Sequence, residues 1–459
     1  MSAPDMEGRM AKKQVRRPRA RGNTNGSGGA TSEVTLGAAG QPTGRYLVTL
    51  KEGSEKSAHN AIQSVLGIRG GLTATADFDG GMKPTELATA PAAVLSSIGV
   101  AIVSAPAAAD LQALAALESD SAIEAVEPEF YVELIEQLEA QEVQETYARG
   151  FRDATSALYR GLFRPGGEAG IGEAEVVAAF GDTAAFTWGL QATGVTRTRF
   201  TGRGMRVAVL DTGLDLRHPD FRGRHIVPQS FVPGVNSVQD GHSHGTHCIG
   251  TALGPAAPPR PPATRRYGCA PTADIYVGKV LNDAGGGMAG WALAGIDWAI
   301  RNTCQVVSMS LGWIISPGHP DSVAFETAAR RGLGRGTLVI AAAGNEGPAG
   351  GLRSPANVPS VMAVGAVDTA LATATFSSRG DVNIAGPGVD VFSTVPMPAR
   401  YGLKSGTSMA CPHVAGIAAL WAESKPHFRG ALLANILMAR TRHLPAPANQ
   451  VGRGLVQAP

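Results

Sequence analysis

The chain of 459 residues has only four cysteines, a net charge of only +2 and no apolar run of about 18 residues. Without such a run, no segment is expected to span a membrane, and we expect no membrane partner. The small net charge gives no electrostatic reason to expect a nucleic-acid partner. The basic N-terminal residues are not followed by the apolar stretch of a signal peptide. The hypotheses for location are the cytoplasm, export without a signal peptide, or a different translation start.

The cysteines are too few and too widely spaced for a disulfide framework. No CxxC pair is present, so their spacing does not suggest a zinc site. We interpret them as free thiols that serve as small buried residues, at positions Cys248, Cys269, Cys304 and Cys411.

Composition and periodicity divide the chain into four segments. Residues 1–43 are rich in Gly, Ser and Arg without apolar periodicity, which predicts a disordered basic tail. Residues 44–133 are predicted to form a small α+β unit, with strands at 45–50, 98–103 and 122–132 and a helix at 107–117. Residues 134–187 have apolar residues at helical spacing as far as Phe163, which predicts an amphipathic helix followed by a linker. Residues 188–459 are predicted to form the main domain.

Short apolar runs alternate with helical stretches throughout the main domain. This alternation predicts parallel strands joined by crossover helices, in a three-layer α/β fold. Ligands of such folds bind at the carboxyl ends of the strands, so the residues that follow each run are candidate site residues. The runs lie at 207–210, 275–277, 306–311, 338–343 and 361–367.

Three side chains that could take part in catalysis lie at the ends of predicted strands or helices. Asp211 ends an apolar run, His244 lies in a segment with three histidines, and Ser408 precedes a helical stretch. Taken singly, each has another explanation: Asp211 as a helix cap or metal ligand, His244 as a metal ligand, and Ser408 as an ordinary helix N-cap. The histidines are not at the i, i+4 spacing of a helical zinc site. Together the three residues supply a serine nucleophile, a base to take its proton and a carboxylate to orient the base.

A fourth segment, AAAGNEG, delivers the amide of Asn345 from an apolar strand into a glycine turn. The NH2 group of an asparagine can donate a hydrogen bond to the oxyanion of a tetrahedral intermediate. The backbone N–H of Ser408, at a helix N-terminus, is a candidate second donor.

The strings VAVLDTG, HSHGTHCIGT, AAAGNEG and GTSMACPHVAG follow the order found in subtilisin-like serine proteases, the subtilases. From about Trp188 to Pro459 the chain closely resembles this family. The resemblance implies a serine endopeptidase with a subtilisin-like fold and a mostly parallel sheet. It assigns the carboxylate, the base, the nucleophile and the oxyanion donor to Asp211, His244, Ser408 and Asn345. The neighbouring His242 and His247 do not match the base position and are interpreted as structural.

The resemblance also implies how substrates bind. Two segments resemble the strand edges that pair with an extended polypeptide, as in β-augmentation. They are Gly285, Gly286 and Gly287, and Ser310, Leu311 and Gly312. We expect polypeptide substrates, a monomer, and no cofactor for the chemistry.

The segment before the protease resembles the subtilase propeptide, which is an intramolecular chaperone and inhibitor. The likeness rests on the strand at Tyr46 and on the string GVAIVSAPAAADLQALAALESDSAIEAVEPEFYV. In the family the end of the propeptide occupies the active cleft until it is cut. We therefore expect the chain to cut itself between Glu133 and Trp188.

Three further residues carry hypotheses. Asp220 matches a calcium ligand of the family, but the Pro- and Arg-rich segment 254–268 lacks the usual calcium loop, and a weaker second site near Asn383 is an alternative. Arg353 either favours an acidic side chain at the residue before the cut or faces solvent. Cys248 either makes the enzyme sensitive to thiol reagents or is simply a small buried residue.

The principal alternative function is a catalytically silent subtilase that acts as a binding or regulatory protein. All four key residues are present, which favours an active enzyme.

Overall fold

A computed structural model describes residues 36–68, 72–77, 86–87, 90–104, 110–135, 179–259, 265–316 and 318–459. The predicted tail lies mostly outside these residues, as do residues 136–163 of the predicted amphipathic helix. The predicted boundaries of the disordered tail and of the amphipathic helix are wrong. Residues 36–43 of the expected disordered tail are ordered, because Gly40 N–H donates to Tyr131 O (2.9 Å) and the first strand already begins at Pro42. Leu134, the first residue of the expected helix, instead ends a strand.

The main domain is built on a nine-stranded sheet with the order β17-β18-β14-β13-β12-β10-β6-β8-β7. All of its neighbouring strands are parallel except β17 and β18. The strands are β6 (Arg206–Asp211), β7 (Ile226–Ser230), β8 (Asp274–Lys279), β10 (Val306–Met309), β12 (Leu338–Ala342), β13 (Met362–Val367), β14 (Ile384–Pro387), β17 (Thr441–Arg442) and β18 (Leu455–Val456).

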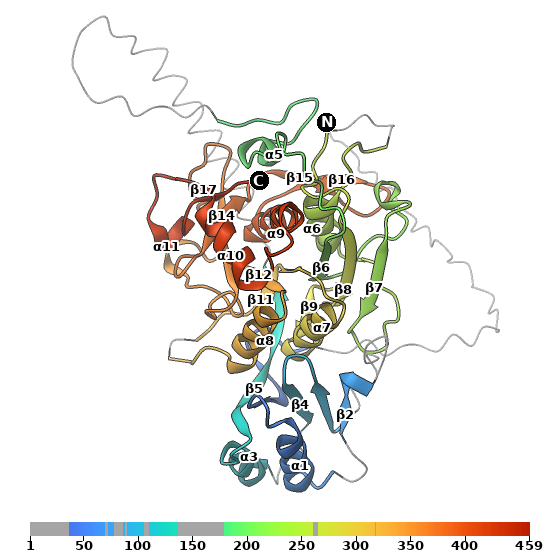
Figure 1. The fold of residues 1–459 in the computed structure, drawn as a ribbon, viewed down its shortest axis with the longest axis vertical. Helices are drawn as coiled ribbons and strands as arrows, with labels where there is room; N and C mark the ends of the chain where they lie inside the picture. Colours follow the sequence, from blue (N-terminus) through green and yellow to red (C-terminus); the bar gives the residue numbers. More distant parts are fainter. Residues whose placement is uncertain are drawn as a thin grey trace, which may run out of the picture. The chain divides into compact units, whose positions relative to one another are not determined.

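Helices cover both faces of this sheet (Figure 1). Alternate residues of β6 face opposite layers: Val207 and Val209 join the core cluster that contains α6 and α9, while Ala208 and Leu210 join the cluster that contains α7 and α8. This is the three-layer α/β fold expected from the alternating apolar runs. The helices are α5 (Trp188–Ala192), α6 (His244–Leu253), α7 (Ala289–Arg301), α8 (Val323–Gly334), α9 (Thr407–Ser424), α10 (Gly430–Ala439) and α11 (Ala448–Val451), and a hairpin joins β15 (Val391–Thr394) to β16 (Tyr401–Lys404).

The N-terminal unit has an antiparallel sheet core with two helices on one side. Val48, Ala101 and Val103 form a small core with Ile62 and Leu117 of the helices. The opposite face of the sheet, including Leu47 and Ile102, packs with residues of α7 and α8. The elements are β1 (Pro42–Leu50), α1 (Glu55–Val65), β2 (Thr73–Ala74), β3 (Ala92–Leu95), β4 (Val100–Ser104), α3 (Asp110–Glu118) and β5 (Ile123–Leu134).

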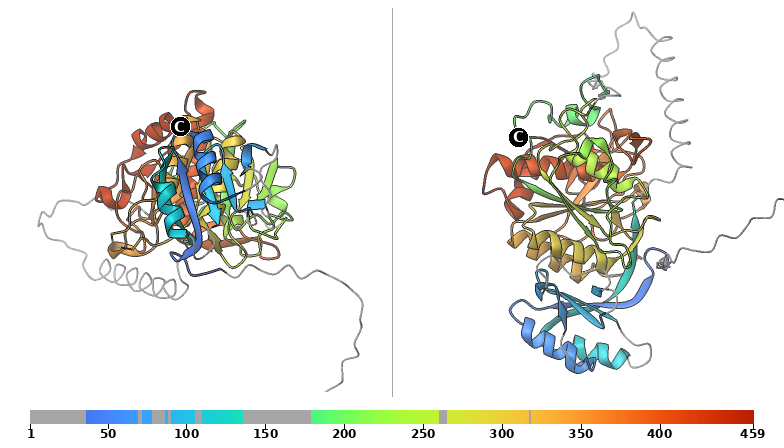
Figure 2. Two further views of the ribbon diagram at one scale, coloured as in Figure 1. Left: turned by 90° about the horizontal axis from the view of Figure 1, so that it is seen from below. Right: turned by 90° about the vertical axis from the view of Figure 1, so that its right-hand side faces the viewer.

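The last strand of this unit, β5, continues into the main domain. It pairs with β1 along its first part, and its end is hydrogen-bonded between β9 (Gly286–Met288) and β11 (Leu311–Gly312). The strand is visible as the long cyan ribbon that joins the two parts in Figure 2. Because β9 and β11 follow two strands of the main sheet, β5 is carried directly to the candidate site.

Two acidic side chains of β5 fix the packing against the helices. Glu127 accepts hydrogen bonds from Val323 N–H (2.8 Å) and from the Ser322 hydroxyl at the start of α8. Glu129 accepts one from Gly290 N–H (2.8 Å) at the start of α7. Hydrogen-bond acceptors are favourable at these positions because the first backbone N–H groups of a helix have no partners within the helix. Among the described helices, none has the length and apolar character needed to cross a membrane.

Candidate active site

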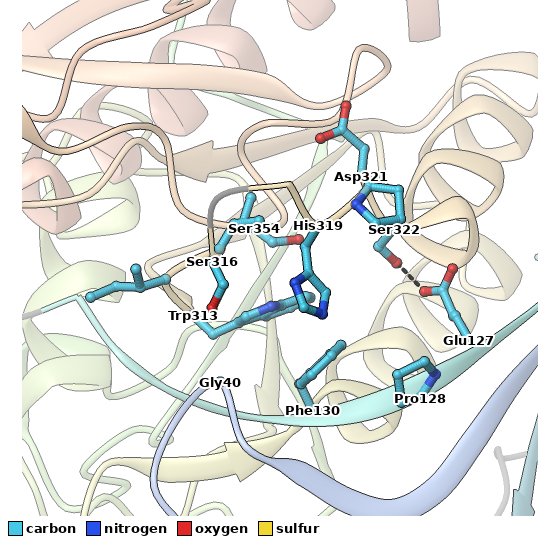
Figure 3. Close-up of a pocket in the computed structure, with 13 residues that line it drawn as sticks. Gly40, Glu127, Pro128, Phe130, Trp313, Ser316, His319, Asp321, Ser322 and Ser354 are labelled. Atoms are coloured by element: carbon cyan, nitrogen blue, oxygen red, sulfur yellow. Dashed lines mark hydrogen bonds between the residues drawn. The ribbon is translucent and has the colours of Figure 1, made fainter.

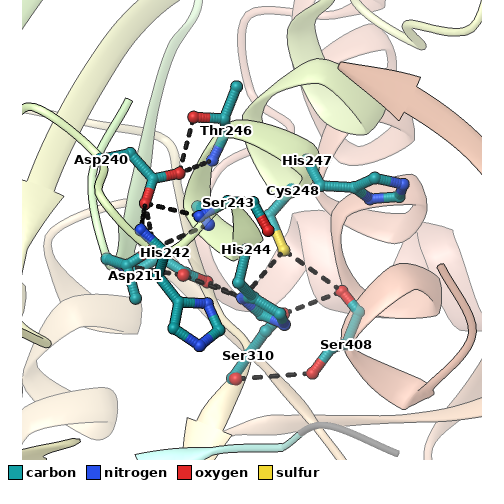
Figure 4. Close-up of polar contacts among 12 residues, drawn as sticks. Asp211, Asp240, His242, Ser243, His244, Thr246, His247, Cys248, Ser310 and Ser408 are labelled. Atoms are coloured by element: carbon teal, nitrogen blue, oxygen red, sulfur yellow. Dashed lines mark hydrogen bonds and ion pairs between the residues drawn. The ribbon is translucent and has the colours of Figure 1, made fainter. Parts of the chain in front are cut away.

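The fold brings Asp211, His244 and Ser408 together from three different elements (Figure 4). Asp211 is the last residue of β6, His244 is the first residue of α6, and Ser408 lies in the first turn of α9. All three are at most 1% exposed. Parallel strands deliver side chains to one edge of a sheet, which explains how residues almost 200 positions apart can meet.

The imidazole of His244 is held by the carboxylate of Asp211. Its Nδ1 lies 2.9 Å from Oδ1 and 3.0 Å from Oδ2 of Asp211. The carboxylate also accepts a hydrogen bond from Thr212 N–H at 2.7 Å. A carboxylate at Nδ1 requires that nitrogen to carry the proton, which leaves Nε2 as the basic atom. Nε2 has no hydrogen-bond partner among the described residues.

Asp240 fixes the start of the helix that carries His244. Ser243 precedes the helix at a φ of 98°, in the left-handed region that few non-glycine residues adopt. Asp240 Oδ1 accepts from Ser243 N–H (2.9 Å), and its Oδ2 accepts from N–H (2.9 Å) and the hydroxyl (2.6 Å) of Thr246. Burial opposes its ionisation, but the hydrogen bonds from Thr246 and from backbone N–H groups lower the pKa of Asp240 overall. Asp240 therefore acts as the N-terminal cap that Ser243 does not provide.

A carbonyl group of the chain itself occupies the space in front of Ser408. The Ser408 hydroxyl donates to the carbonyl oxygen of Ile135 at 2.7 Å. The amide of Asn345 donates to the same oxygen, with Nδ2 at 3.0 Å. Thr407 orients this amide, because its N–H and its hydroxyl both donate to Asn345 Oδ1 at 2.9 Å. The candidate nucleophile and the candidate oxyanion donor therefore converge on one peptide carbonyl.

All six residues expected to bind substrate line the strand that ends at this carbonyl. Glu133 pairs with Gly286 on one side and with Gly312 on the other, and Val132 pairs with Gly287. Leu134 N–H donates to Gly285 O (3.0 Å), and Leu134 pairs with Leu311. Ile135 N–H donates to Ser310 O at 3.2 Å.

Glycine is required at one of these positions by close packing. A Cβ atom on Gly287 would lie 2.5 Å from Val280 O and 3.3 Å from the side chain of Val132. The glycine-rich edge thus allows the backbone of a bound strand to approach closely.

One of the two sequence-based interpretations of Arg353, that it faces solvent, is wrong. It does not face solvent, since only 9% of the residue is exposed. Its guanidinium instead pairs with Glu346 (Nη2 to Oε1, 2.6 Å) and with Glu133 of β5 (Nη1 to Oε1, 3.0 Å).

Two other reactive side chains near the site, His247 and Cys248, are buried. His247 is buried, and its Nε2 lies 2.9 Å from Val391 O. Burial lowers the pKa of His247 well below the ordinary range, so the ring is neutral. The sulfur of Cys248 lies 3.7 Å from His244 Nδ1 and 3.5 Å from Ser408 O. Burial, and then the charge of Asp211, raise the pKa of the Cys248 thiol, which therefore stays protonated.

Asp220, the expected calcium ligand, is already fully engaged by other groups. Its carboxylate accepts from the hydroxyls of Tyr267 (2.5 Å) and Tyr401 (2.9 Å) and from the guanidinium of Arg400 (3.1 Å). Burial and the neighbouring carboxylate raise the pKa of both tyrosines, which keeps their hydroxyls as donors. Arg400 also binds Pro259 O at 2.7 Å. A calcium ion needs six to eight free oxygen ligands, so these residues do not fit one.

At the alternative calcium position, one side-chain oxygen is already used within the protein. The side-chain oxygen of Asn383 accepts a hydrogen bond from Ala363 N–H at 2.6 Å and so ties two segments of the main domain together.

A pocket of about 100 Å³ lies beside β5, away from the triad (Figure 3). Phe130 of β5 stacks on Trp313 with ring centroids 5.8 Å apart, and His319 meets Phe130 edge-on at 6.3 Å. Gly40 and Pro128 of the N-terminal unit complete part of the wall. This pocket therefore lies at the contact between the N-terminal unit and the main domain.

Sequence reasoning did not find Ile135, Thr407 or Asp240. Thr407 directly precedes the serine, so its place beside Asn345 could have been considered from the motif. The helix predicted from residue 134 onward includes Leu134 and Ile135, although these apolar residues also continue the preceding strand pattern. Asp240 lies four residues before His244, where its carboxylate could have been considered as a cap.

Comparisons with family profiles and with individual proteins point to the same family. Residues 202–454 match the profile described as the Subtilase family. Subtilisin of Bacillus pumilus is 40% identical over 264 residues, which are 56% of this chain and 90% of that protein. Subtilisin Savinase of Lederbergia lenta is 41% identical over 277 residues, 59% of this chain and 96% of that protein. Subtilisin E of Bacillus subtilis (strain 168) is 40% identical, and the match spans 65% of its length. The chain therefore belongs to the subtilase family of serine endopeptidases.

Proposed function

We propose that the protein is a zymogen that cuts its own chain between Ile135 and Glu136 and then hydrolyses extended polypeptides at the same site. The observation that carries this proposal is the Ile135 carbonyl, which lies within hydrogen-bond distance of both Ser408 and Asn345. As a subtilase, the enzyme acts on polypeptides and needs no cofactor for its chemistry.

The proposed reaction follows from the contacts around this carbonyl. Oγ of Ser408 attacks the carbonyl carbon of Ile135 while Nε2 of His244 takes its proton. The negative charge that develops on the carbonyl oxygen is stabilised by the Nδ2 donor of Asn345. His244 then gives the proton to the departing nitrogen of Glu136. In the second half, water attacks the acyl carbon while His244 takes its proton, and His244 returns that proton to Ser408 Oγ as the bond to Ile135 breaks and its carboxyl group is released. Asp211 keeps the imidazole in the required tautomer and stabilises its positive charge.

After the cut, β5 is expected to remain in the cleft as a product-like inhibitor. Its main chain is hydrogen-bonded to strand edges on both sides, and its unit packs on α7 and α8. Extended substrates would pair with the same two edges once the unit has left.

The test of this proposal is the N-terminus of the processed protein. Mass spectrometry is expected to find Glu136 as the first residue of the large fragment and Ile135 as the last residue of the small one. An organophosphonate is expected to label Ser408 once the small fragment has left. A single cut elsewhere, with the Ile135–Glu136 bond intact, would contradict the proposed site.

The N-terminal unit is expected to be held more weakly as pH rises. Burial raises the pKa of Glu127, and burial likewise raises the pKa of Asp297, which accepts a hydrogen bond from Ser97 N–H (2.6 Å) across the contact. On release both carboxyl groups return to ordinary pKa values, so release is coupled to proton loss. The stabilisation is complete below the ordinary carboxyl pKa and is lost as pH rises through the raised values.

Size-exclusion chromatography of the processed protein at a series of pH values measures this release. Asp297→Asn keeps the hydrogen-bond acceptor and removes one titrating group, so the pH dependence should become shallower. A bound fraction that grows with pH would show that the sign is wrong.

A further inference from the structure

The side chain of Glu133 makes a charged contact that is specific to its place in the cleft. Counting back from the Ile135 carbonyl, Glu133 is the third residue before the bond to be cut, the P3 position. Its carboxylate lies 3.0 Å from Nη1 of Arg353. About half of the Glu133 side chain (47%) is exposed, whereas the Arg353 side chain is only 10% exposed. The arginine is therefore the buried partner and the glutamate the more exposed one.

Arg353 is held in place by contacts that do not involve the N-terminal unit. Its backbone N–H donates to Ala343 O at 2.9 Å. Its Nε and Nη2 bind one oxygen of Glu346 at 2.7 and 2.6 Å. The other oxygen of Glu346 accepts from the Ser378 hydroxyl at 2.9 Å. Two of the three guanidinium nitrogens are thus used within the main domain, and Nη1 is the one that reaches the bound strand.

We propose that Arg353 is a specificity residue that selects an acidic side chain at P3 of polypeptide substrates. Departure of β5 would leave Nη1 facing the cleft, already oriented by the Glu346 pair. A P3 carboxylate from a substrate in the same extended pairing would reach the position that Glu133 holds. Arginine suits this role because its planar guanidinium binds one carboxylate while it presents a further donor to a second.

The geometry favours P3 over P1 as the acid-selecting position. The Ile135 side chain is 1% exposed and belongs to an apolar cluster of the main domain. An acid placed there would lose its hydration, whereas at P3 it stays half-exposed beside a preset cation. Glu346 already neutralises Arg353 in part, so a modest preference is expected.

The inference rests on the proposed function, since it takes Ile135 as the residue before the cut. The test uses the full chain after self-cleavage and departure of the small fragment, with peptides of sequence Tyr-Val-X-Leu-Ile that carry a fluorogenic amide leaving group, where X is Glu, Gln or Lys. At low salt, kcat/KM for the Glu peptide is expected to exceed that for the Gln peptide by about three- to tenfold, the size of a partly exposed charge pair. The Lys peptide should be the poorest. High salt should compress the differences, because exposed charges are screened.

Variants separate Arg353 from other sources of selectivity. Arg353→Met should bring the Glu to Gln ratio to about one, and Arg353→Lys should leave an intermediate ratio, because the charge stays but the fork is lost. Arg440→Met, a matched charge loss at the exposed residue that follows α10, should keep the wild-type ratio. If Arg353→Met does not fold, the wild-type salt dependence and Arg353→Lys still provide the test.

The outcomes distinguish the two proposals. Hydrolysis of all three peptides at equal rates, or a Glu preference that survives in Arg353→Met, would overturn the P3 inference and leave the proposed function standing. Failure to hydrolyse any peptide, with Ser408 unreactive toward an organophosphonate, would overturn both.

Discussion

Replacement of Ser408 by alanine is expected to leave the chain uncut and to lower kcat for peptide hydrolysis by about a million-fold, the loss seen when subtilisin is deprived of its nucleophile. Without Oγ, no acyl-enzyme can form, and His244 has no hydroxyl to deprotonate. The side chain is fully buried and small, so its replacement should leave the fold intact. Gel electrophoresis and intact mass measure the uncut chain, and a fluorogenic peptide measures the activity.

A matched control for this variant lies on the same helix. Ser424→Ala removes a hydroxyl from the last residue of α9, where it donates to Trp421 O at 2.7 Å. This variant should be cut and should hydrolyse peptide as the wild type does. Self-cleavage at the Ile135–Glu136 bond in purified Ser408→Ala would require a different nucleophile and would contradict the proposed mechanism.

The central sheet and the candidate triad could be predicted from the sequence for physical reasons. Parallel strands covered on both faces must be apolar along their whole length, so β6, β10 and β12 stand out as short apolar runs. The candidate catalytic side chains end such runs, follow directly after them or begin the next helix. Asp211 and Asn345 were found in this way, and the chemical demands of a serine nucleophile linked them to His244 and Ser408.

Contacts between segments far apart in the sequence could not be predicted in the same way. Whether Leu134 ends a strand or begins a helix depends on its pairing with Leu311, and local periodicity does not record that pairing. Arg353 meets Glu133 across 220 residues of chain, and Arg400 meets Asp220 across 180. A sequence shows that these residues are charged but not which opposite charge each will find. For this reason the ion pair between Arg353 and Glu133 could not be predicted from the sequence.

The ordered residues 36–43 illustrate the same limit. Their composition is that of a disordered tail, and local sequence offers no reason for them to fold. They are held by partners elsewhere, because Gly40 and Gln41 exchange backbone hydrogen bonds with Tyr131 of β5. Edge pairing of this kind uses only backbone groups, so it leaves almost no trace in the sequence.

Replacement of Asn345 by alanine is expected to slow both self-cleavage and peptide hydrolysis by about 10²–10³-fold in kcat, the effect of losing such a donor in subtilisin. The loss should fall on kcat with little change in KM, because the hydrogen bond strengthens as the carbonyl oxygen gains charge. Steady-state kinetics of the fluorogenic peptide separates the two constants. Asn345→Asp should be at least as slow, because a carboxylate cannot donate to the oxyanion and would repel it.

Two further variants identify the cause of this loss. Thr407→Val removes the hydroxyl donor to Asn345 Oδ1 but keeps the N–H donor, so a smaller fall in kcat is expected. Asn435→Ala, on the exposed side of α10, should behave as wild type. A raised KM with unchanged kcat in Asn345→Ala would mean that the amide binds the ground state and the transition state equally, and the oxyanion role would then be wrong. A fall in kcat graded from Asn345→Ala to Thr407→Val would instead support orientation of the donor amide by Thr407.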